Sequence, residues 1–215
     1  MSEKRLHLVR HGEVWNPDGV LYGRLPAFDL SPLGRRMAMA AADALVADGR
    51  PVSTLIASPL ERAQQSAEPI STAFALPVAI DERIIEPRND FEGQVKTGRG
   101  SAMLNPRFWY RYRNPFLPSW GEAYASIADR ALNAMNDAWR RAPETGDIVM
   151  VSHQAVIWMT HLAVAGKPFF HNPARRRCAL SSITSFERRG GRWVEVQYRS
   201  PAAHLLAESI DVGAV

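Results

Sequence analysis

Short apolar stretches alternate with segments of helical composition along most of the chain, and this alternation limits the choice of fold more than any other feature. Residues 6–10 and 52–57 have the length and apolar content of strands. Each is followed, directly or after a loop, by a Ser-Pro pair, which suits a helix start because serine caps it and proline fits its first turn. We therefore expect helices over about 31–47 and 60–74, with the second kinked or broken at Pro69.

The alternation continues through the second half of the chain. Residues 82–121, rich in Pro, Gly, Arg and aromatic side chains, show no sustained period. Around them we expect a strand at 76–81, helices at 121–142 and 154–165, a strand at 147–152, and a hairpin of 181–188 with 192–199. Strands that alternate with helices predict an α/β fold, a three-layer αβα sandwich whose mostly parallel central sheet has an antiparallel edge.

Size and composition point to one folding unit. A chain of 215 residues with 46% hydrophobic content can build one core, so we expect a single domain over 1–215 with a covering insertion at about 87–121. No stretch approaches the roughly 18 apolar residues of a membrane span, and the charged first residues lead straight into a strand. We expect a cytoplasmic protein with no membrane partner. Cys178 is the only cysteine, which predicts a buried thiol rather than a disulfide framework.

The arginines are unevenly placed. The formal net charge is +4, and basic and aromatic residues interleave over 107–120. This pattern predicts a lid that packs its aromatics on the core and directs cations to a substrate. The candidates for such contacts are Lys96, Arg99, Arg107 and Arg111. The run of three arginines at 175–177 can either close the pocket or face solvent, and we expect it to face solvent.

Three predicted strands end in residues with useful chemistry. The first delivers Arg10 and His11, and the second leads to Arg62 one turn into the following helix. The strand at 147–152 leads to His153. Alone, each of these residues is more often structural. Because ligands bind beyond the carboxyl ends of parallel strands, we expect the side chains to share one site.

These residue types suit phosphoryl transfer. Negative charge spreads over three phosphoryl oxygens in the reaction, so catalysis consists mainly of positioning and of fixed cations. The guanidinium groups of Arg10 and Arg62 can each donate two parallel hydrogen bonds. A neutral imidazole at His11 can attack phosphorus, and His153 can donate to an equatorial oxygen.

The leaving oxygen also needs a proton. A carboxylic acid can supply it if burial or nearby negative charge keeps the acid protonated near neutral pH. Glu86, in the loop after the strand at 76–81, is our candidate, and Glu13 and Glu92 are its rivals.

Four short segments carry these residues in a fixed order, namely 8–13, 58–63, 84–86 with 91–93, and 151–153. They resemble the motifs of the histidine phosphatase superfamily, also called the phosphoglycerate mutase-like family. The first closes a strand with Arg-His-Gly, the second carries a phosphate-contacting arginine, the third looks like the segment that supplies the acid, and the fourth carries the second histidine. The match runs over roughly 6–165, and several motifs at compatible spacing are far more specific than any one of them.

The resemblance implies a phosphoglycerate mutase-like fold, a phosphohistidine at His11, and neither a metal ion nor another cofactor. It also suggests Asn16 as a phosphate contact, and we expect Tyr22, Gly23 and Gln154 to contact the substrate as well. The mutases of the family tend to be longer and to carry a fuller substrate-binding insertion. We therefore expect a monomeric or homodimeric phosphatase that hydrolyses a small phosphorylated compound.

Other functions remain open at this point. The nearest alternative is mutase-type transfer, in which the phosphoryl group passes to a second substrate oxygen instead of water. A catalytically silent phospho-ligand binder is another, and the basic and aromatic segment 107–120 is compatible with single-stranded nucleic acid, although we expect no nucleic-acid partner. A metallohydrolase is disfavoured because the six histidines show no tight ligand pair beyond the weak spacing of His7 and His11.

Overall fold

The computed structural model describes residues 4–94, 121–172 and 175–211. The described residues form a six-stranded sheet with the order β3-β2-β4-β1-β5-β6. Its parallel part consists of β1 (Leu6–Arg10), β2 (Val52–Ala57), β3 (Val78–Ile80) and β4 (Asp147–Ser152). β5 (Ile183–Arg189) pairs antiparallel with β1, and β6 (Arg192–Arg199) pairs antiparallel with β5.

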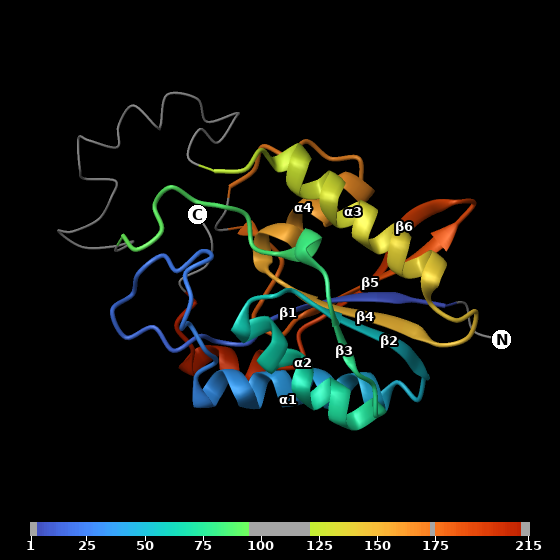
Figure 1. Cartoon of the computed structure of the whole chain (residues 1–215), viewed down its shortest axis with the longest axis horizontal. Coiled ribbons are helices and arrows are strands. Elements are labelled where there is room, and N and C mark those ends of the chain that lie inside the picture. The colour runs from blue at the N-terminus through green and yellow to red at the C-terminus, as the bar shows by residue number, and fades with distance from the viewer. Residues whose placement is uncertain (1–3, 95–120, 173–174, 212–215) are drawn as a thin grey trace.

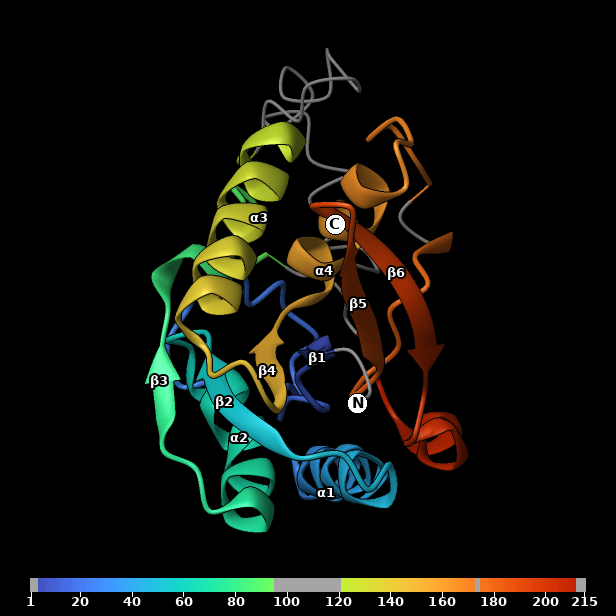
Figure 2. The same cartoon turned by 90° about the vertical axis from the view of Figure 1, so that its right-hand side faces the viewer.

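Helices cover both faces of this sheet. α1 (Pro32–Ala47) and α2 (Glu61–Phe74) lie on one face, and α3 (Tyr124–Arg141) and α4 (Gln154–Val164) lie on the other (Figures 1 and 2). Two short 3₁₀ helices, η1 (Glu82–Ile84) and η5 (Ala203–Glu208), complete the described elements. The result is the predicted αβα sandwich with an antiparallel edge, which is thereby confirmed.

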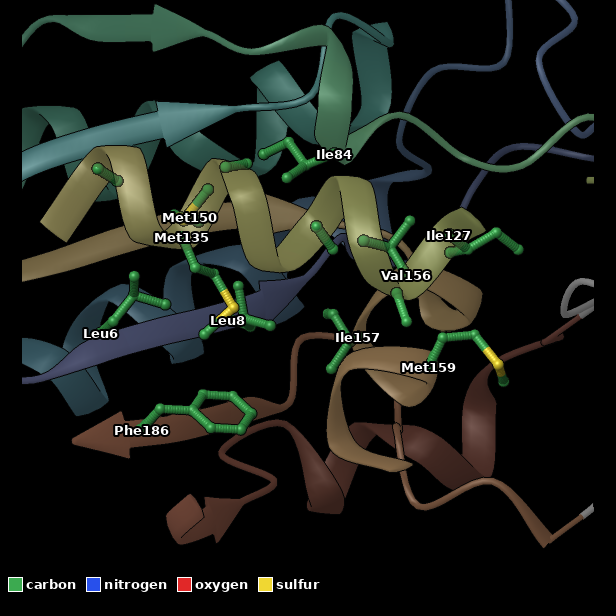
Figure 3. Close-up of a cluster of buried hydrophobic side chains, with 14 of the residues drawn as sticks. Leu6, Leu8, Ile84, Ile127, Met135, Met150, Val156, Ile157, Met159 and Phe186 are labelled. Atoms are coloured by element: carbon green, nitrogen blue, oxygen red, sulfur yellow. The ribbon is translucent and has the colours of Figure 1, made fainter. Parts of the chain in front are cut away.

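Successive side chains of a strand point to opposite faces of the sheet, so each strand contributes to the hydrophobic clusters on both faces. Leu6 and Leu8 of β1 belong to the cluster under α3 and α4, whereas Val9 belongs to the cluster under α1 and α2. Figure 3 shows how β1, β4 and β5 direct apolar side chains toward those of α3 and α4 on the first face. Strands buried on both faces read as continuous apolar runs, which is why 147–152 resembles a parallel core strand in the sequence.

The helix starts follow the local signals. Ser31 caps α1 because its Oγ accepts the Gly34 N–H at 2.9 Å, and Pro32 occupies the first turn. Of the kink or break predicted at Pro69, the break is wrong, since α2 continues to Phe74. Ala67 and Ile70, on either side of the proline, are both buried in the same cluster, and this packing holds the helix across the missing backbone hydrogen bond.

The remaining expectations have mixed outcomes. The strands and helices lie within a few residues of their predicted bounds, but η5 was not predicted. Most of the expected covering insertion at 87–121, with Lys96, Arg99, Arg107 and Arg111, lies outside the described residues. Within the described part of the chain, none of the helices has the length and apolar character needed to cross a membrane. The single-domain and cytoplasmic assignments stay predictions.

Candidate active site

The carboxyl ends of β1, β4 and β2 lie side by side and bring the three predicted strand-end motifs together. Backbone hydrogen bonds extend the sheet one residue beyond the strands. The His11 N–H donates to Ser152 O, and the Ser58 N–H donates to Val151 O, each at 3.0 Å. The rings of His11 and His153 are 5.2 Å apart, centroid to centroid. The structure thus brings the three segments together, and the roles of their residues in a shared site stay predictions.

His11 is held in one tautomer. Its Nδ1 lies 2.7 Å from Gly12 O, a carbonyl that can only accept, so Nδ1 carries the hydrogen and Nε2 keeps its lone pair. Burial, with Arg62 and Arg10 nearby, holds the pKa of His11 well below its ordinary value, so the imidazole is neutral. A neutral ring with an available Nε2 is the form that a nucleophile requires.

Gly12 fixes the approach of this segment to α1. A Cβ at Gly12 would lie 2.3 Å from Gly34 O, and one at Gly34 would lie 2.0 Å from Glu13 O. The two glycines therefore let the backbone after His11 lie directly on the first turn of α1. The Gly12 N–H also donates to Ser66 Oγ of α2 at 3.1 Å. The loop after β1 is thus fixed by both helices on its face of the sheet.

His153 lies between Ser58 and Glu86. Its Nε2 lies 2.7 Å from Ser58 Oγ, and Ser58 Oγ accepts the Leu60 N–H at 3.5 Å. With the Leu60 N–H accepted by its oxygen, the Ser58 hydroxyl can donate its hydrogen to His153 Nε2, an arrangement in which Nδ1 carries the imidazole hydrogen. That Nδ1 lies 3.5 Å from Glu86 Oε2, while burial and the cations nearby lower the pKa of His153 well below its ordinary value.

Glu86 has the properties expected of the acid. It is buried, and its burial raises its pKa despite the opposing effect of Arg62 and Arg10. The two other candidates for the acid make hydrogen bonds away from His153. Glu13 accepts hydrogen bonds from Ser31 Oγ and from the Ile210 N–H, and Glu92 accepts them from the backbone N–H groups of Arg24 and Asn89. Of these three carboxylates, Glu86 is the one that faces His153.

The two arginines are buried charges. Arg10 is 1% exposed; it donates to Cys178 O at 2.7 Å and forms a two-pronged ion pair with Asp211, at 2.8 and 2.7 Å. Burial opposes the charged form of Arg10, but Asp211 outweighs it and raises the pKa of the guanidinium. Arg62 is fully buried and donates through Nη2 to Gly23 O at 2.7 Å. Its guanidinium carbon also lies 4.7 Å from the centre of the Tyr22 ring.

Several buried polar atoms of these residues have no hydrogen-bond partner among the described residues. They are Arg10 Nε, Arg62 Nε and Nη1, His153 Nδ1 and Glu86 Oε1. An unmade hydrogen bond on a buried group is costly, so such atoms mark a place where a ligand completes the structure. Four of the five belong to cationic or N–H groups, and the N-termini of α2 and α4 lie directly beside them. The arrangement suits an anion with several oxygens.

The predicted substrate-binding residues have different surroundings. Tyr22 and Gly23 both contact Arg62. Asn16 uses its amide within its own loop, donating to Val20 O and accepting the Val20 N–H. Gln154 begins α4 and accepts a hydrogen bond from Arg176 Nη1 at 3.3 Å. Their roles toward a substrate stay predictions.

One prediction about the arginine run needs correction. Arg177 is exposed and pairs with Glu195, as a solvent-facing residue does. Arg176, in contrast, is 9% exposed and donates to His171 Nε2 at 2.8 Å as well as to Gln154. Its charge lies near enough to Glu86 to influence the pKa of that carboxyl. The irregular segment after α4 turns this side chain inward, and periodicity carries no signal for such a turn.

Asp211 was not foreseen either. It lies 201 residues from Arg10 in the sequence, and it follows a short 3₁₀ helix that no pattern predicted. The one general reason to expect such a partner is the burial of Arg10, because a fully buried guanidinium needs a carboxylate or phosphate to compensate its charge.

A family model describes this combination of fold and residues. The model of the histidine phosphatase superfamily, branch 1, matches residues 6–201. The chain belongs to this superfamily. The resemblance inferred from the four motifs is therefore confirmed, and so is the expected class of enzyme, a histidine-type phosphatase or mutase.

Relatives in this superfamily have several named activities. An uncharacterised protein of Mycobacterium tuberculosis is 49% identical over 94% of this chain and 98% of its own length. The glucosyl-3-phosphoglycerate phosphatase of Mycolicibacterium vanbaalenii is 31% identical, covering 78% of this chain and 77% of that protein. Among solved structures, a mycobacterial glucosyl-3-phosphoglycerate phosphatase superposes with a TM-score of 0.73 at 26% identity, over 90% of this chain and 97% of the other.

Proposed function

We propose that this protein is a metal-independent phosphatase that hydrolyses a small phosphorylated compound through a phosphohistidine at His11. The observation that carries the proposal is the imidazole of His11. It is neutral, fixed by Gly12 O with Nε2 available, and buried beside two guanidinium groups whose unpartnered N–H atoms suit phosphoryl oxygens. A nucleophile and fixed cations in one buried place are the elements that phosphoryl transfer needs.

In the first step, His11 Nε2 forms a bond to phosphorus while the bond from phosphorus to the ester oxygen breaks. Arg10 and Arg62 hold the charge on the equatorial oxygens, and His153 Nδ1 donates to one of them. The departing oxygen takes its proton from Glu86, because burial raises the pKa of this carboxyl and favours its protonated form. The products of this step are the free alcohol and the phosphoenzyme.

In the second step, water replaces the alcohol. The Glu86 carboxylate, deprotonated by the first step, takes a proton from water as the water oxygen attacks phosphorus. The bond from Nε2 to phosphorus breaks, and the imidazole regains its neutral form. Glu86 is protonated again, inorganic phosphate leaves, and the starting state is restored without a metal ion or an external redox partner.

The named relatives include both phosphatases and a probable mutase. Besides the glucosyl-3-phosphoglycerate phosphatase, a metal-independent phosphoserine phosphatase of Arabidopsis thaliana is 28% identical over 73% of this chain and 67% of its own length. A probable phosphoglycerate mutase of Cronobacter sakazakii is 27% identical over 96% of this chain and 97% of its own length. Transfer between two positions of a phosphoglycerate is therefore the second candidate function.

The test combines a phosphate-release assay with a mutase assay on the same purified protein. Wild-type protein is expected to release inorganic phosphate from a panel of phosphorylated metabolites in the presence of a chelator, and His11→Ala is expected to lose this activity. Interconversion of phosphoglycerates without phosphate release would favour the mutase. Identical behaviour of wild type and His11→Ala on the whole panel would reject both functions.

A further inference from the structure

The ion pair between Arg10 and Asp211 uses the same donors that a phosphoryl group would need. The two carboxylate oxygens face Arg10 Nη1 and Nη2 at 2.8 and 2.7 Å, the two-pronged geometry with which a guanidinium binds a phosphate. Arg10 Nη1 also donates to Cys178 O, and its Nε has no partner among the described residues. An oxyanion that binds this fork must therefore take the place of the carboxylate.

The two partners differ in their freedom to move. Arg10 is 1% exposed and stands at the end of β1, inside the sheet. The side chain of Asp211, in contrast, is 36% exposed. The carboxylate is therefore the partner that a phosphoryl group can displace, because the partly exposed carboxylate stays hydrated while the phosphoryl group compensates the buried charge of Arg10.

The segment that carries Asp211 begins in apolar packing and reaches the site through polar contacts. Leu205 of η5 is buried in a cluster with Met37, Leu180 and Ala202, which fixes the start of the segment. Farther along, the Ile210 N–H donates to Glu13 Oε1 at 2.7 Å, while the Ile210 side chain is 73% exposed. At this end of the segment, the Ile210 backbone and the Asp211 carboxylate make polar contacts with the site, so another anion can replace the carboxylate at Arg10 without opening the apolar cluster around Leu205.

We infer that Asp211 is a further active-site residue, an internal carboxylate that neutralises Arg10 in the free enzyme and competes with the phosphoryl group for the same fork. Substrate displaces it on binding, because a phosphate dianion can also use the unpartnered donors of Arg62. After hydrolysis the carboxylate returns to Arg10 and favours departure of inorganic phosphate. The inference rests on the proposed function in one respect, namely that Arg10 binds phosphate.

The test is the affinity of the full-length protein for inorganic phosphate, measured by isothermal titration calorimetry for wild type and Asp211→Asn. An amide keeps the size of the side chain but lacks the charge and the second acceptor oxygen. We expect Asp211→Asn to bind phosphate about fivefold more tightly or more, the factor that corresponds to a partly exposed ion pair. In turnover assays, KM is expected to fall and phosphate to become a stronger product inhibitor.

The chain offers a matched control. Asp48, the C-cap of α1, forms a two-pronged pair with Arg199 at 2.7 and 2.6 Å, and it is also partly exposed. Asp48→Asn therefore removes the same kind of ion pair without touching Arg10, and it is expected to leave phosphate affinity unchanged.

Three results overturn the inference. Weaker phosphate binding by Asp211→Asn would mean that the carboxylate orients Arg10 for phosphate instead of competing with it. Unchanged affinity would mean that the pair does not form in solution, and an absence of phosphate binding in every variant would mean that Arg10 is no phosphate site. Because calorimetry needs no turnover, these outcomes can be told apart from a failure of the proposed hydrolysis.

Discussion

Replacement of Arg62 by methionine tests the contribution of the buried guanidinium to catalysis. Methionine keeps much of the side-chain volume but removes Nε and Nη1, the two donors that have no partner among the described residues. Each charge-assisted hydrogen bond to a phosphoryl oxygen is worth about 1.5–3 kcal/mol, so two of them contribute about 3–6 kcal/mol. At about 1.36 kcal/mol per factor of ten, kcat/KM is expected to fall roughly 10²- to 10⁴-fold.

The fold is expected to survive this change. Burial lowers the pKa of Arg62, which shows that the charged form is held at a cost that an apolar side chain avoids. Loss of the bond to Gly23 O works in the opposite direction, so the unfolding temperature is expected to change little. Steady-state kinetics on a phosphate ester, with thermal unfolding followed by circular dichroism, measures both quantities.

The matched control is Arg35→Met on α1. Arg35 is 53% exposed and has a loose ion pair with Glu68 at 3.8 Å, so its removal is expected to change neither kinetics nor folding. A loss of less than tenfold in well-folded Arg62→Met, or an equal loss in both variants, would refute the assignment of phosphate binding to Arg62.

Three further predictions follow from the same geometry. Glu86→Gln is expected to slow hydrolysis of alkyl phosphates about 10²- to 10⁴-fold but that of a nitrophenyl phosphate far less, because a phenolate leaves without a proton; equal losses on both esters would exclude Glu86 as the acid. In wild type, the raised pKa of Glu86 is expected to set the alkaline limb of the kcat/KM profile, since the acid form is needed first. The lowered pKa of His11 places the acid limb below 6.5, since a protonated imidazole cannot attack. Persistence of the alkaline limb in Glu86→Gln would contradict this reading. Asp147→Asn is expected to lower the free energy of unfolding, measured by urea denaturation, by about 3–5 kcal/mol, because the substitution removes the buried carboxylate that pairs with Arg50 and His7. Burial alone would raise the pKa of Asp147, but the hydrogen bonds from Arg50 and His7 outweigh burial and lower it in the folded protein. The charged carboxylate therefore contributes its whole stabilisation above the pKa of the unfolded chain, about 3.9, and this contribution is lost as the pH falls toward the lowered pKa of the folded protein. A difference between wild type and Asp147→Asn that stays constant from about pH 5 to about pH 2 would show that this linkage is absent.

The parts of the fold that the sequence predicts are those with local signals. Ser31-Pro32 caps α1 as expected, and the apolar run of β4 ends at Ser152, directly before His153. Neighbouring parallel strands bring their carboxyl ends to one edge of the sheet, so the proximity of His11 and His153 follows from topology alone. Motif spacing and sheet direction thus suffice to locate the candidate site.

Features that depend on tertiary packing escape such reasoning. The inward turn of Arg176 and the pairing of Asp211 with Arg10 involve irregular segments with no period. Pro69 disrupts a helix in isolation, yet α2 continues because its apolar face packs on the sheet. His7, which had only a weak metal-site spacing to recommend it, instead lies between Ser185 Oγ and Asp147 as a buried link between strands.

The most direct test of the proposed mechanism is the identification of the covalent intermediate. The protein is mixed rapidly with substrate, quenched in alkali to preserve a phosphohistidine, digested and analysed by mass spectrometry. We expect one phosphoryl group on the peptide that contains His11, formed at least as fast as steady-state turnover and absent from His11→Asn. A phosphoryl group on another residue, or undiminished turnover by His11→Asn, would contradict the mechanism.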